Sequence, residues 1–285
     1  MAVTLTDYDA GPQTAWCPGC GNFYILRAVK QALVELDLPP HQVLMVSGIG
    51  QAGKFPHYLR CNTFNSLHGR TLPPATGAKL VNPELVAIAI GGDGDGYAEG
   101  GNHFLHACRR NVDITYIIHN NQVYGLTKGQ ASPTSDVGWV TRTTPLGVIG
   151  APFNPLALAL AAGATFISRG FVQEERHLVD LVKRAIQHPG FALVDVLQPC
   201  ISFNSRNTYR WYRERVYKLG EDYDPRDRLA AFQKAQEWGD RIPIGLLYVE
   251  EKPTFESQVP SLQKGPLVRL EADPRRLAPV LAEFF

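Results

Sequence analysis

Two aspartates stand in a glycine-rich turn that directly follows an apolar run of residues. The run is Leu85–Ile90, and the turn reads Gly91-Gly92-Asp93-Gly94-Asp95-Gly96. Glycines that follow a parallel strand let the backbone approach a ligand at the carboxyl edge of a sheet. Two carboxylates would repel a diphosphate there unless a cation lay between them, so the turn predicts a hard divalent ion that carries phosphate oxygens. An ordinary turn with capping aspartates is the alternative.

A dinucleotide-binding loop is the first rival interpretation of this turn, and the glycine spacing argues against it. The GxGxxG pattern counted from Gly92 requires a glycine where Tyr97 stands. Counted from Gly94, the same pattern requires a glycine where Glu99 stands.

A second polar pair follows the next apolar run, Ile114–His119, which is predicted to be the neighbouring strand. The chain continues there as Asn120-Asn121-Gln122-Val123-Tyr124-Gly125. Because the carboxyl ends of parallel strands meet at one edge of a sheet, an amide oxygen after this strand is expected within reach of the same cation.

The cysteine pair Cys17-Pro18-Gly19-Cys20 is the other feature with possible chemistry. Taken alone, it is compatible with a chance pair, half of a zinc site or a redox motif. A zinc ribbon needs a second CxxC within about 20 residues, and the sequence has none. A thioredoxin-like site needs a preceding strand, whereas an irregular arm with glycine and proline precedes this pair.

Alternating strands and helices are expected to position these loops. Helices are predicted at 22–36, 73–80, 101–110, 155–162 and 177–187, and strands at 42–46, 85–90, 114–119, 164–168, 192–196 and 245–249. This order predicts an α/β fold with a doubly wound parallel sheet. Residues 1–200 are expected to form the ligand-binding domain with its N-terminal cysteine segment. Residues 201–285, with no strand expected before Gly245, are predicted to be an irregular C-terminal arm that packs on the domain or on a partner.

The composition excludes several classes of partner. Lys and Arg number 28 against 27 Asp and Glu, so neither nucleic acid nor an anionic membrane surface is indicated. The longest apolar stretches, such as Leu156–Ala162, are too short to span a bilayer, and the N-terminus does not resemble a signal peptide. The sequence therefore predicts a cytoplasmic protein, in which five cysteines argue against a disulfide framework.

The GDG turn followed by Asn-Asn after the next strand resembles the thiamine diphosphate motif. The resemblance implies that Mg²⁺ is bound by the carboxylate of Asp93, the amide of Asn121 and the carbonyl of Val123. It further implies that the diphosphate is lined by a set of residues from both loops: Gly94, Asp95, Gly125, Leu126 and Thr127.

Further motifs extend the resemblance to nearly the whole chain, from residue 10 to about 255. In order, the motifs are Trp16–Gly21, Ser47–Gly50, Leu67–Arg70, Tyr124–Gln130, Asn207–Tyr209 and Arg213–Lys218. They are similar to the β subunit of 2-oxoacid:ferredoxin oxidoreductases. This family implies thiamine diphosphate, Mg²⁺ and one [4Fe-4S] cluster, with an α subunit as partner in an αβ or α2β2 assembly. It adds four residues to the expected cofactor site: Ile49, Gly50, His68 and Gly92.

The resemblance also assigns the cysteines, because soft thiolates hold iron. It implies cluster ligands at Cys17, Cys20 and Cys200. The sequence departs from the family directly after Ser-Gly-Ile-Gly, where Gln51 stands in place of a cysteine. Cys61 is the expected replacement, with a cluster held by three thiolates, or no cluster, as the alternatives. Cys108 is expected to be a small core residue.

The implied reaction is oxidative decarboxylation of a 2-oxoacid to an acyl-coenzyme A, which could also run in reverse, with electrons passed through the cluster to ferredoxin. By resemblance, Lys54 receives the substrate carboxylate, Leu126 borders the substrate side chain, and His68 and Arg70 lie near the cofactor. His68 and Arg70 could equally form a structural turn. We expect 2-oxoglutarate as substrate, with pyruvate as the alternative.

No glutamate is identified as the partner of the cofactor's aminopyrimidine ring. That group is therefore expected on the α subunit, without which this chain should be inactive. Two other classes stay open at this stage. One is a non-redox thiamine diphosphate decarboxylase or synthase, and the other is an interaction protein whose cysteines hold zinc.

Overall fold

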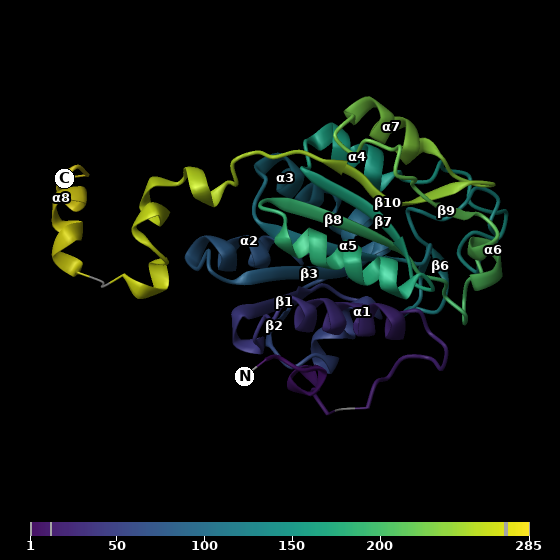
Figure 1. Cartoon of the computed structure of the whole chain (residues 1–285), viewed down its shortest axis with the longest axis horizontal. Coiled ribbons are helices and arrows are strands. Elements are labelled where there is room, and N and C mark those ends of the chain that lie inside the picture. Colours follow the sequence, from purple (N-terminus) through teal and green to yellow (C-terminus); the bar gives the residue numbers. More distant parts are fainter. Residues whose placement is uncertain (1, 12, 271–272, 285) are drawn as a thin grey trace.

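Most of the chain packs around one large, mostly parallel β-sheet (Figure 1). The structure is a computed structural model that describes residues 2–11, 13–270 and 273–284. The strand order is β2-β1-β3-β4-β8-β7-β10-β9. The strands are β1 Val43–Ser47, β2 Asn62–Asn65, β3 Val86–Gly92, β4 Ile114–Asn120, β7 Phe166–Phe171, β8 Phe191–Leu197, β9 Val216–Lys218 and β10 Ile242–Val249. The first six in this order are parallel, and β10 runs antiparallel to β7.

Helices cover both faces of the sheet. The α-helices of the described residues are α1 Asn22–Glu35, α2 Leu72–Val81, α3 Gly101–Arg110, α4 Pro155–Ala162, α5 Glu175–Gln187, α6 Tyr209–Arg213, α7 Arg228–Gln236 and α8 Leu277–Ala282, of which α8 lies away from the sheet. Five helices predicted from the sequence correspond to α1 to α5, and α3 and α4 have the predicted bounds. The predicted doubly wound α/β fold is therefore confirmed.

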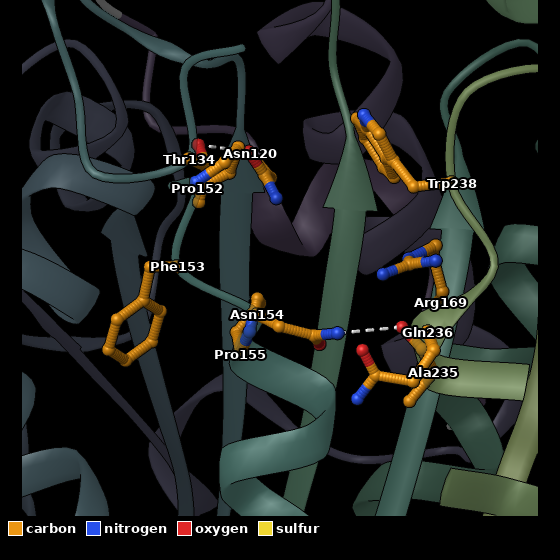
Figure 2. Close-up of a pocket in the computed structure, with 10 residues that line it drawn as sticks. All are labelled: Asn120, Thr134, Pro152, Phe153, Asn154, Pro155, Arg169, Ala235, Gln236 and Trp238. Carbon is orange, nitrogen blue, oxygen red and sulfur yellow. Dashed lines mark hydrogen bonds between the residues drawn. The ribbon is translucent and has the colours of Figure 1, made fainter. Parts of the chain in front are cut away.

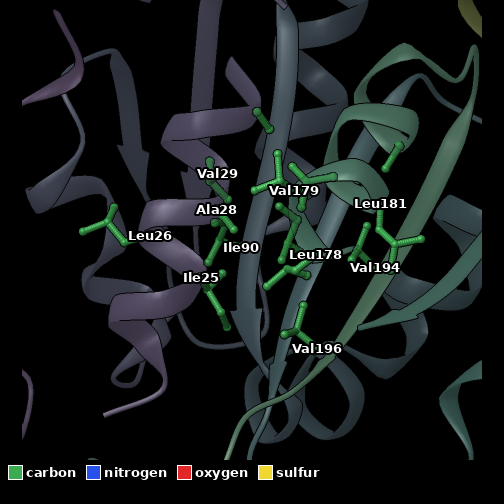
Figure 3. Packing of buried hydrophobic residues seen from close by; sticks show 14 of the residues in the cluster. Ile25, Leu26, Ala28, Val29, Ile90, Leu178, Val179, Leu181, Val194 and Val196 are labelled. Carbon is green, nitrogen blue, oxygen red and sulfur yellow. The ribbon is translucent and has the colours of Figure 1, made fainter. Parts of the chain in front are cut away.

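Two hydrophobic cores, one on each face, explain why the central strands are apolar throughout. Figure 3 shows the first core, in which α1 and α5 pack on β3 and β8 through residues such as Ile25, Leu178, Ile90 and Val194. The second core lies under α2, α3, α4 and α7 and includes Phe104. Strands β4 and β8 are buried along their entire length, as expected where both faces of a parallel sheet are covered.

The chain after residue 200 contributes more to the sheet than the sequence predicted. β9 was not expected, because no strand was predicted before Gly245, and that expectation is wrong. β9 and β10 extend the sheet beyond β7, so this region packs on the domain as far as Val249. The following segment, which ends in α8, extends away from the sheet (Figure 1). The division of the chain at residue 200 remains a proposal.

Within the described residues, every helix is too short or too polar to cross a membrane.

Candidate active site

Three loops meet in a cleft at the carboxyl edge of the sheet. They follow β1, β3 and β4, which are neighbours in the strand order. The cleft has a volume of about 90 Å³. Gln51, Ala52 and Tyr124 line the cleft, and so does every residue that the sequence assigned to the cofactor. Those residues are Ile49, Gly50, His68, Gly92, Asp93, Gly94, Asp95, Asn121, Val123, Gly125, Leu126 and Thr127. The structure thus brings the whole predicted set together at one strand edge, where open α/β sheets bind ligands.

Asp93 is a buried carboxylate held by hydroxyl groups. Its Oδ2 accepts hydrogen bonds from Ser132 Oγ at 2.5 Å and from Thr134 Oγ1 at 2.6 Å. The side chain is only 1% exposed, and burial raises the pKa of the Asp93 carboxyl to about 6. A divalent cation beside it would compensate the lost hydration of the charged form. Together with the amide of Asn121 and the carbonyl of Val123 this gives an all-oxygen set, which fits the preference of Mg²⁺.

Asp95 lines the cleft and also connects its walls, because its carboxylate oxygens accept hydrogen bonds from other segments of the protein. Oδ1 accepts from Ile49 N at 2.9 Å, from Gly69 N at 2.8 Å and pairs with His68 Nδ1 at 2.7 Å. Oδ2 accepts from Thr71 Oγ1 at 3.2 Å. These bonds join the loop after β1 and the His68 turn to the loop after β3. Asp95 therefore holds the cleft walls in place, and Asp93 is the aspartate left to face a cation.

The two asparagines after β4 have different roles. Asn120 is buried, donates from Nδ2 to Asp195 Oδ1 at 3.1 Å and accepts from Thr134 Oγ1 at 3.0 Å. Asn121 lines the cleft, and its Oδ1 accepts from Val123 N at 3.1 Å. The structure thus directs the second asparagine of the pair toward the cleft, as the motif implies.

Tyr124 is a cleft residue for which the sequence predicted no role. Its ring packs against Gly94 so closely that a Cβ at Gly94 would lie 2.2 Å from Tyr124 Cε1. The turn therefore requires glycine at position 94. The turn continues as a π-helical segment, η4 (Gly94–Glu99), an irregularity that is common at functional sites.

Cys17, Cys20 and Cys200 line a second hollow next to the cleft. Ser202 Oγ donates to Cys17 Sγ at 3.2 Å, and Gln198 Nε2 donates to Cys20 Sγ at 3.5 Å. Hydrogen bonds to sulfur are a means by which proteins stabilise cluster thiolates. In the described ranges, no three His, Cys, Asp or Glu side chains lie close enough to hold a single metal ion. A four-iron cluster places irons and sulfides between its ligands, so its thiolates stand farther apart than those of one ion.

The hollow is small for such a cluster, at about 30 Å³. Cys17 is the exposed member of the three, and Cys20 and Cys200 are partly buried. The three thiols fit a soft metal in kind.

Gln51 stands between the hollow and the cleft. Both sites are lined by Gln51, Asn121 and Gly125, so these residues form a shared wall. Trp16 Nε1 donates to the carbonyl of Gln51 at 2.9 Å and fixes its backbone. Within the described residues, the buried Oε1 of Gln51 has no hydrogen-bond partner. The amide oxygen therefore receives no hydrogen bond from the described part of the protein.

Cys61 does not lie with the other three thiols, which corrects the expectation that it completes the set. It precedes β2, whose first residue pairs with Leu44 near the start of β1. The hollow lies instead beyond the carboxyl end of β1. Cys61 packs against the hydrophobic core, and burial raises the pKa of its thiol to about 12. Cys108 is fully buried in the second core, as expected.

Lys54 and Arg70 are the remaining predicted residues. Lys54 lies on the helical turn η3 (Ala52–Tyr58), shortly after the cleft residues Gln51 and Ala52. Lys54 itself is not one of the described residues that line the cleft. Arg70 Nη1 donates to the carbonyl of Glu99 at 3.1 Å, which supports the structural interpretation of its turn.

The fold and the cleft define a class of protein. Parallel strands that end in the GDG loop and the asparagine pair, with an oxygen-rich cleft between them, are typical of thiamine diphosphate-binding α/β domains. Residues 42–196 match the family described as thiamine pyrophosphate enzyme, C-terminal TPP binding domain. Residues 200–264 match the C-terminal family of the pyruvate ferredoxin oxidoreductase β subunit.

Whole-chain relatives define the family more narrowly. A 2-oxoacid:ferredoxin oxidoreductase subunit beta of Saccharolobus solfataricus is 49% identical over 86% of this chain and 85% of its own. Subunit beta of 2-oxoacid:ferredoxin oxidoreductase 1 of Aeropyrum pernix is 45% identical over 98% of this chain and 91% of its own. A solved structure of the 2-oxoglutarate:ferredoxin oxidoreductase of Magnetococcus marinus is 37% identical, with a TM-score of 0.92 over 98% of this chain and 96% of that chain. The chain belongs to the family of 2-oxoacid:ferredoxin oxidoreductase β subunits.

Proposed function

We propose that this β subunit, together with a partner α subunit, oxidatively decarboxylates 2-oxoglutarate with coenzyme A as acyl acceptor and ferredoxin as electron acceptor. The observation that carries this proposal is the wall shared by the cofactor cleft and the thiol hollow. Because Gln51, Asn121 and Gly125 line both sites, an electron donor in the cleft and an acceptor in the hollow would be separated by a single layer of residues.

The chain's own residues bind and orient the cofactor. Asp93, Asn121 and Val123 would hold Mg²⁺, whose charge would offset that of the diphosphate. Asp95 fixes the loops that carry Ile49 and His68, so the cleft keeps its shape. Thiamine diphosphate, when bound, supplies the electron sink for loss of carbon dioxide, so the protein's task is positioning.

The cysteines support an oxidoreductase over a non-redox decarboxylase. A decarboxylase would have no need of Cys17, Cys20 and Cys200 beside its cofactor cleft, and here all three line the adjoining hollow. In the proposed function Cys17, Cys20 and Cys200 would hold a [4Fe-4S] cluster, which would supply one-electron redox chemistry beside the cleft.

The choice of 2-oxoglutarate rests on relatives. The structure from Magnetococcus marinus is described with 2-oxoglutarate, coenzyme A and succinyl-CoA bound. The relative in Mycobacterium tuberculosis is named a 2-oxoglutarate oxidoreductase subunit and is 46% identical over 70% of this chain, although the match spans 53% of that relative.

A partner subunit is expected for two reasons besides the family. No glutamate is among the residues that line the described cleft, so the aminopyrimidine partner must come from elsewhere. The segment after residue 251 leaves apolar side chains exposed, among them Leu267, Val268, Leu277 and Leu281. Exposed apolar residues on an extended segment are typical of a surface that another chain covers. We infer an αβ or α2β2 assembly.

The proposed reaction is tested by assaying the anaerobic complex against a panel of 2-oxoacids with coenzyme A and a ferredoxin. We expect the highest kcat/KM with 2-oxoglutarate, followed by pyruvate, and no activity of this chain alone. A higher value for pyruvate would overturn the substrate assignment. Decarboxylation without ferredoxin reduction would instead identify a non-redox enzyme.

Replacement of Lys54 by methionine tests the proposed carboxylate contact. A charge-assisted hydrogen bond contributes about 1.5–3 kcal/mol, so its loss should raise KM for the 2-oxoacid by about 10- to 150-fold. The affinity for thiamine diphosphate should change little, because Lys54 lies outside the residues that line the cleft. Lys252→Met, which removes a lysine paired with Glu250 on the surface, is the matched control. Unaltered kinetics of Lys54→Met would make Lys54 a solvated loop residue.

A further inference from the structure

A cavity of about 250 Å³ lies beside the sheet, apart from the cofactor cleft. Figure 2 shows it between the start of α4, the end of β4, strand β7 and the chain that follows α7. It shares no lining residue with the cleft or the thiol hollow. Its walls combine apolar groups with a few polar ones, the composition typical of sites for small organic molecules.

Arg169 is the chemically notable group in this cavity. It is 3% exposed, projects from β7 and lines the cavity (Figure 2). Its Nε lies 3.5 Å from Asp195 Oδ2, yet neither Nε nor Nη1 has a hydrogen-bond partner within the described part of the chain. Buried guanidinium donors without hydrogen-bond acceptors are costly, because they have lost their water.

Asp195 balances the charge of Arg169 through the long Nε–Oδ2 contact, but it leaves Nη1 without an acceptor, and its other oxygen accepts from two neutral donors. Tyr97 Oη donates to Asp195 Oδ1 at 2.9 Å, and Asn120 Nδ2 donates to the same atom at 3.1 Å. The Arg169 guanidinium carbon lies 5.5 Å over the Trp238 ring. Because Nε and Nη1 are closed off from the cavity, Nη2 is the donor that an anion in the cavity would reach.

The remaining walls indicate what kind of anion fits. Phe153, Pro152 and Trp238 supply apolar surface, and α4 begins at Pro155 with its N-terminal end toward the cavity. Guanidinium groups form charge-assisted hydrogen bonds with carboxylates. The volume of about 250 Å³ approaches the range of about 300–1,000 Å³ that is typical of small-molecule sites.

We propose that this cavity binds a small organic carboxylate, with its carboxylate on Arg169 and its apolar body against Phe153 and Trp238. Asn120 and Thr134 separate it from Asp93, so the ligand would lie behind the metal-binding carboxylate and outside the reaction. The proposal does not depend on the identity of the 2-oxoacid substrate or on the cluster.

Isothermal titration calorimetry of the complete complex tests this site with three probes. These are 3-methylbutanoate, its uncharged analogue 3-methylbutanamide, and inorganic phosphate. We expect binding of 3-methylbutanoate, with at least about tenfold weaker binding of the amide, which cannot pair with the guanidinium charge. Equal affinity of the amide, tighter binding of phosphate, or no binding of any probe would overturn the proposal.

A charge variant locates the binding site without disturbing Arg169, whose removal would leave Asp195 buried and unpaired. Gln236 lines the cavity at the end of α7, and Gln236→Glu adds a negative charge at nearly constant shape. We expect it to weaken 3-methylbutanoate about tenfold by repulsion. Gln233→Glu, an exposed change on the same helix that lies outside the cavity lining, should leave the affinity unchanged. Equal affinity in Gln236→Glu and the unaltered complex would place the ligand elsewhere and refute the site.

Discussion

Replacement of Asp93 by alanine should abolish binding of thiamine diphosphate at ordinary magnesium concentrations. Asp93 is the one carboxylate in the proposed magnesium set, whose other donors are the neutral oxygens of Asn121 and Val123. Substitution of a residue that only hydrogen-bonds to a metal ligand already lowers metal affinity by about 10- to 100-fold. Loss of the ligating carboxylate itself should therefore lower the affinity by more than about 100-fold.

The described part of the chain offers no second carboxylate in the cleft that could replace Asp93. Asp95 cannot take over, because Ile49, Gly69, His68 and Thr71 already occupy its oxygens. The alanine variant would also leave the hydroxyls of Ser132 and Thr134 without their acceptor. Asp93→Asn is therefore the better matched variant, since it keeps an acceptor for these hydroxyls while removing the charge.

Calorimetric titration of each variant complex with thiamine diphosphate at fixed Mg²⁺ measures the effect, and circular dichroism verifies that the variants are folded. Asp180→Ala, a change on the exposed surface of α5, serves as control and should bind the cofactor normally. A folded Asp93→Asn complex with unaltered cofactor affinity would refute the metal assignment.

The sequence predicted the strands and loops around the cleft well, because the signals there are local. β3 and β4 are continuous apolar runs, and the chemistry follows each run directly, at Asp93 and at Asn121. Strand order then brings the two loops together without any further information. The edge strand β2 was missed for the opposite reason, since its residues Asn62–Asn65 are all exposed and carry no apolar alternation.

The role of Asp95 depends on partners that are distant in sequence. Its donors come from positions 24 to 46 residues away, and no spacing rule connects them. The position of Arg169 in a cavity could not be predicted for a related reason, since a single arginine in the buried strand Phe166–Phe171 forms no sequence motif. Pairing of side chains across elements is tertiary information, which periodicity does not contain.

The separation of Cys61 from Gln51 along the sequence does not indicate their separation in the fold. Only ten residues separate it from Gln51, but η3 intervenes and returns the chain to the start of β1. We therefore expect Cys61→Ser to keep the full iron content of the anaerobic complex. Cys20→Ser, in contrast, should lose most of the iron, because Cys20 is one of three thiols that line the hollow. Iron analysis and the visible absorption of the cluster measure both.

The fourth coordination position is expected to belong to Gln51. Gln51 lines the hollow, its Oε1 has no hydrogen-bond partner within the described residues, and an amide oxygen is a weaker ligand for iron than a thiolate. Mild oxidation of the unaltered complex should therefore release one iron and produce the electron paramagnetic resonance signal of a three-iron cluster. Gln51→Cys should supply a fourth thiolate and suppress that signal, whereas Cys61→Ser and Cys108→Ser should leave it unchanged. A four-iron cluster that resists oxidation in the unaltered complex but not in Cys61→Ser would restore Cys61 as the ligand and show that the segment before β2 rearranges when the cluster binds.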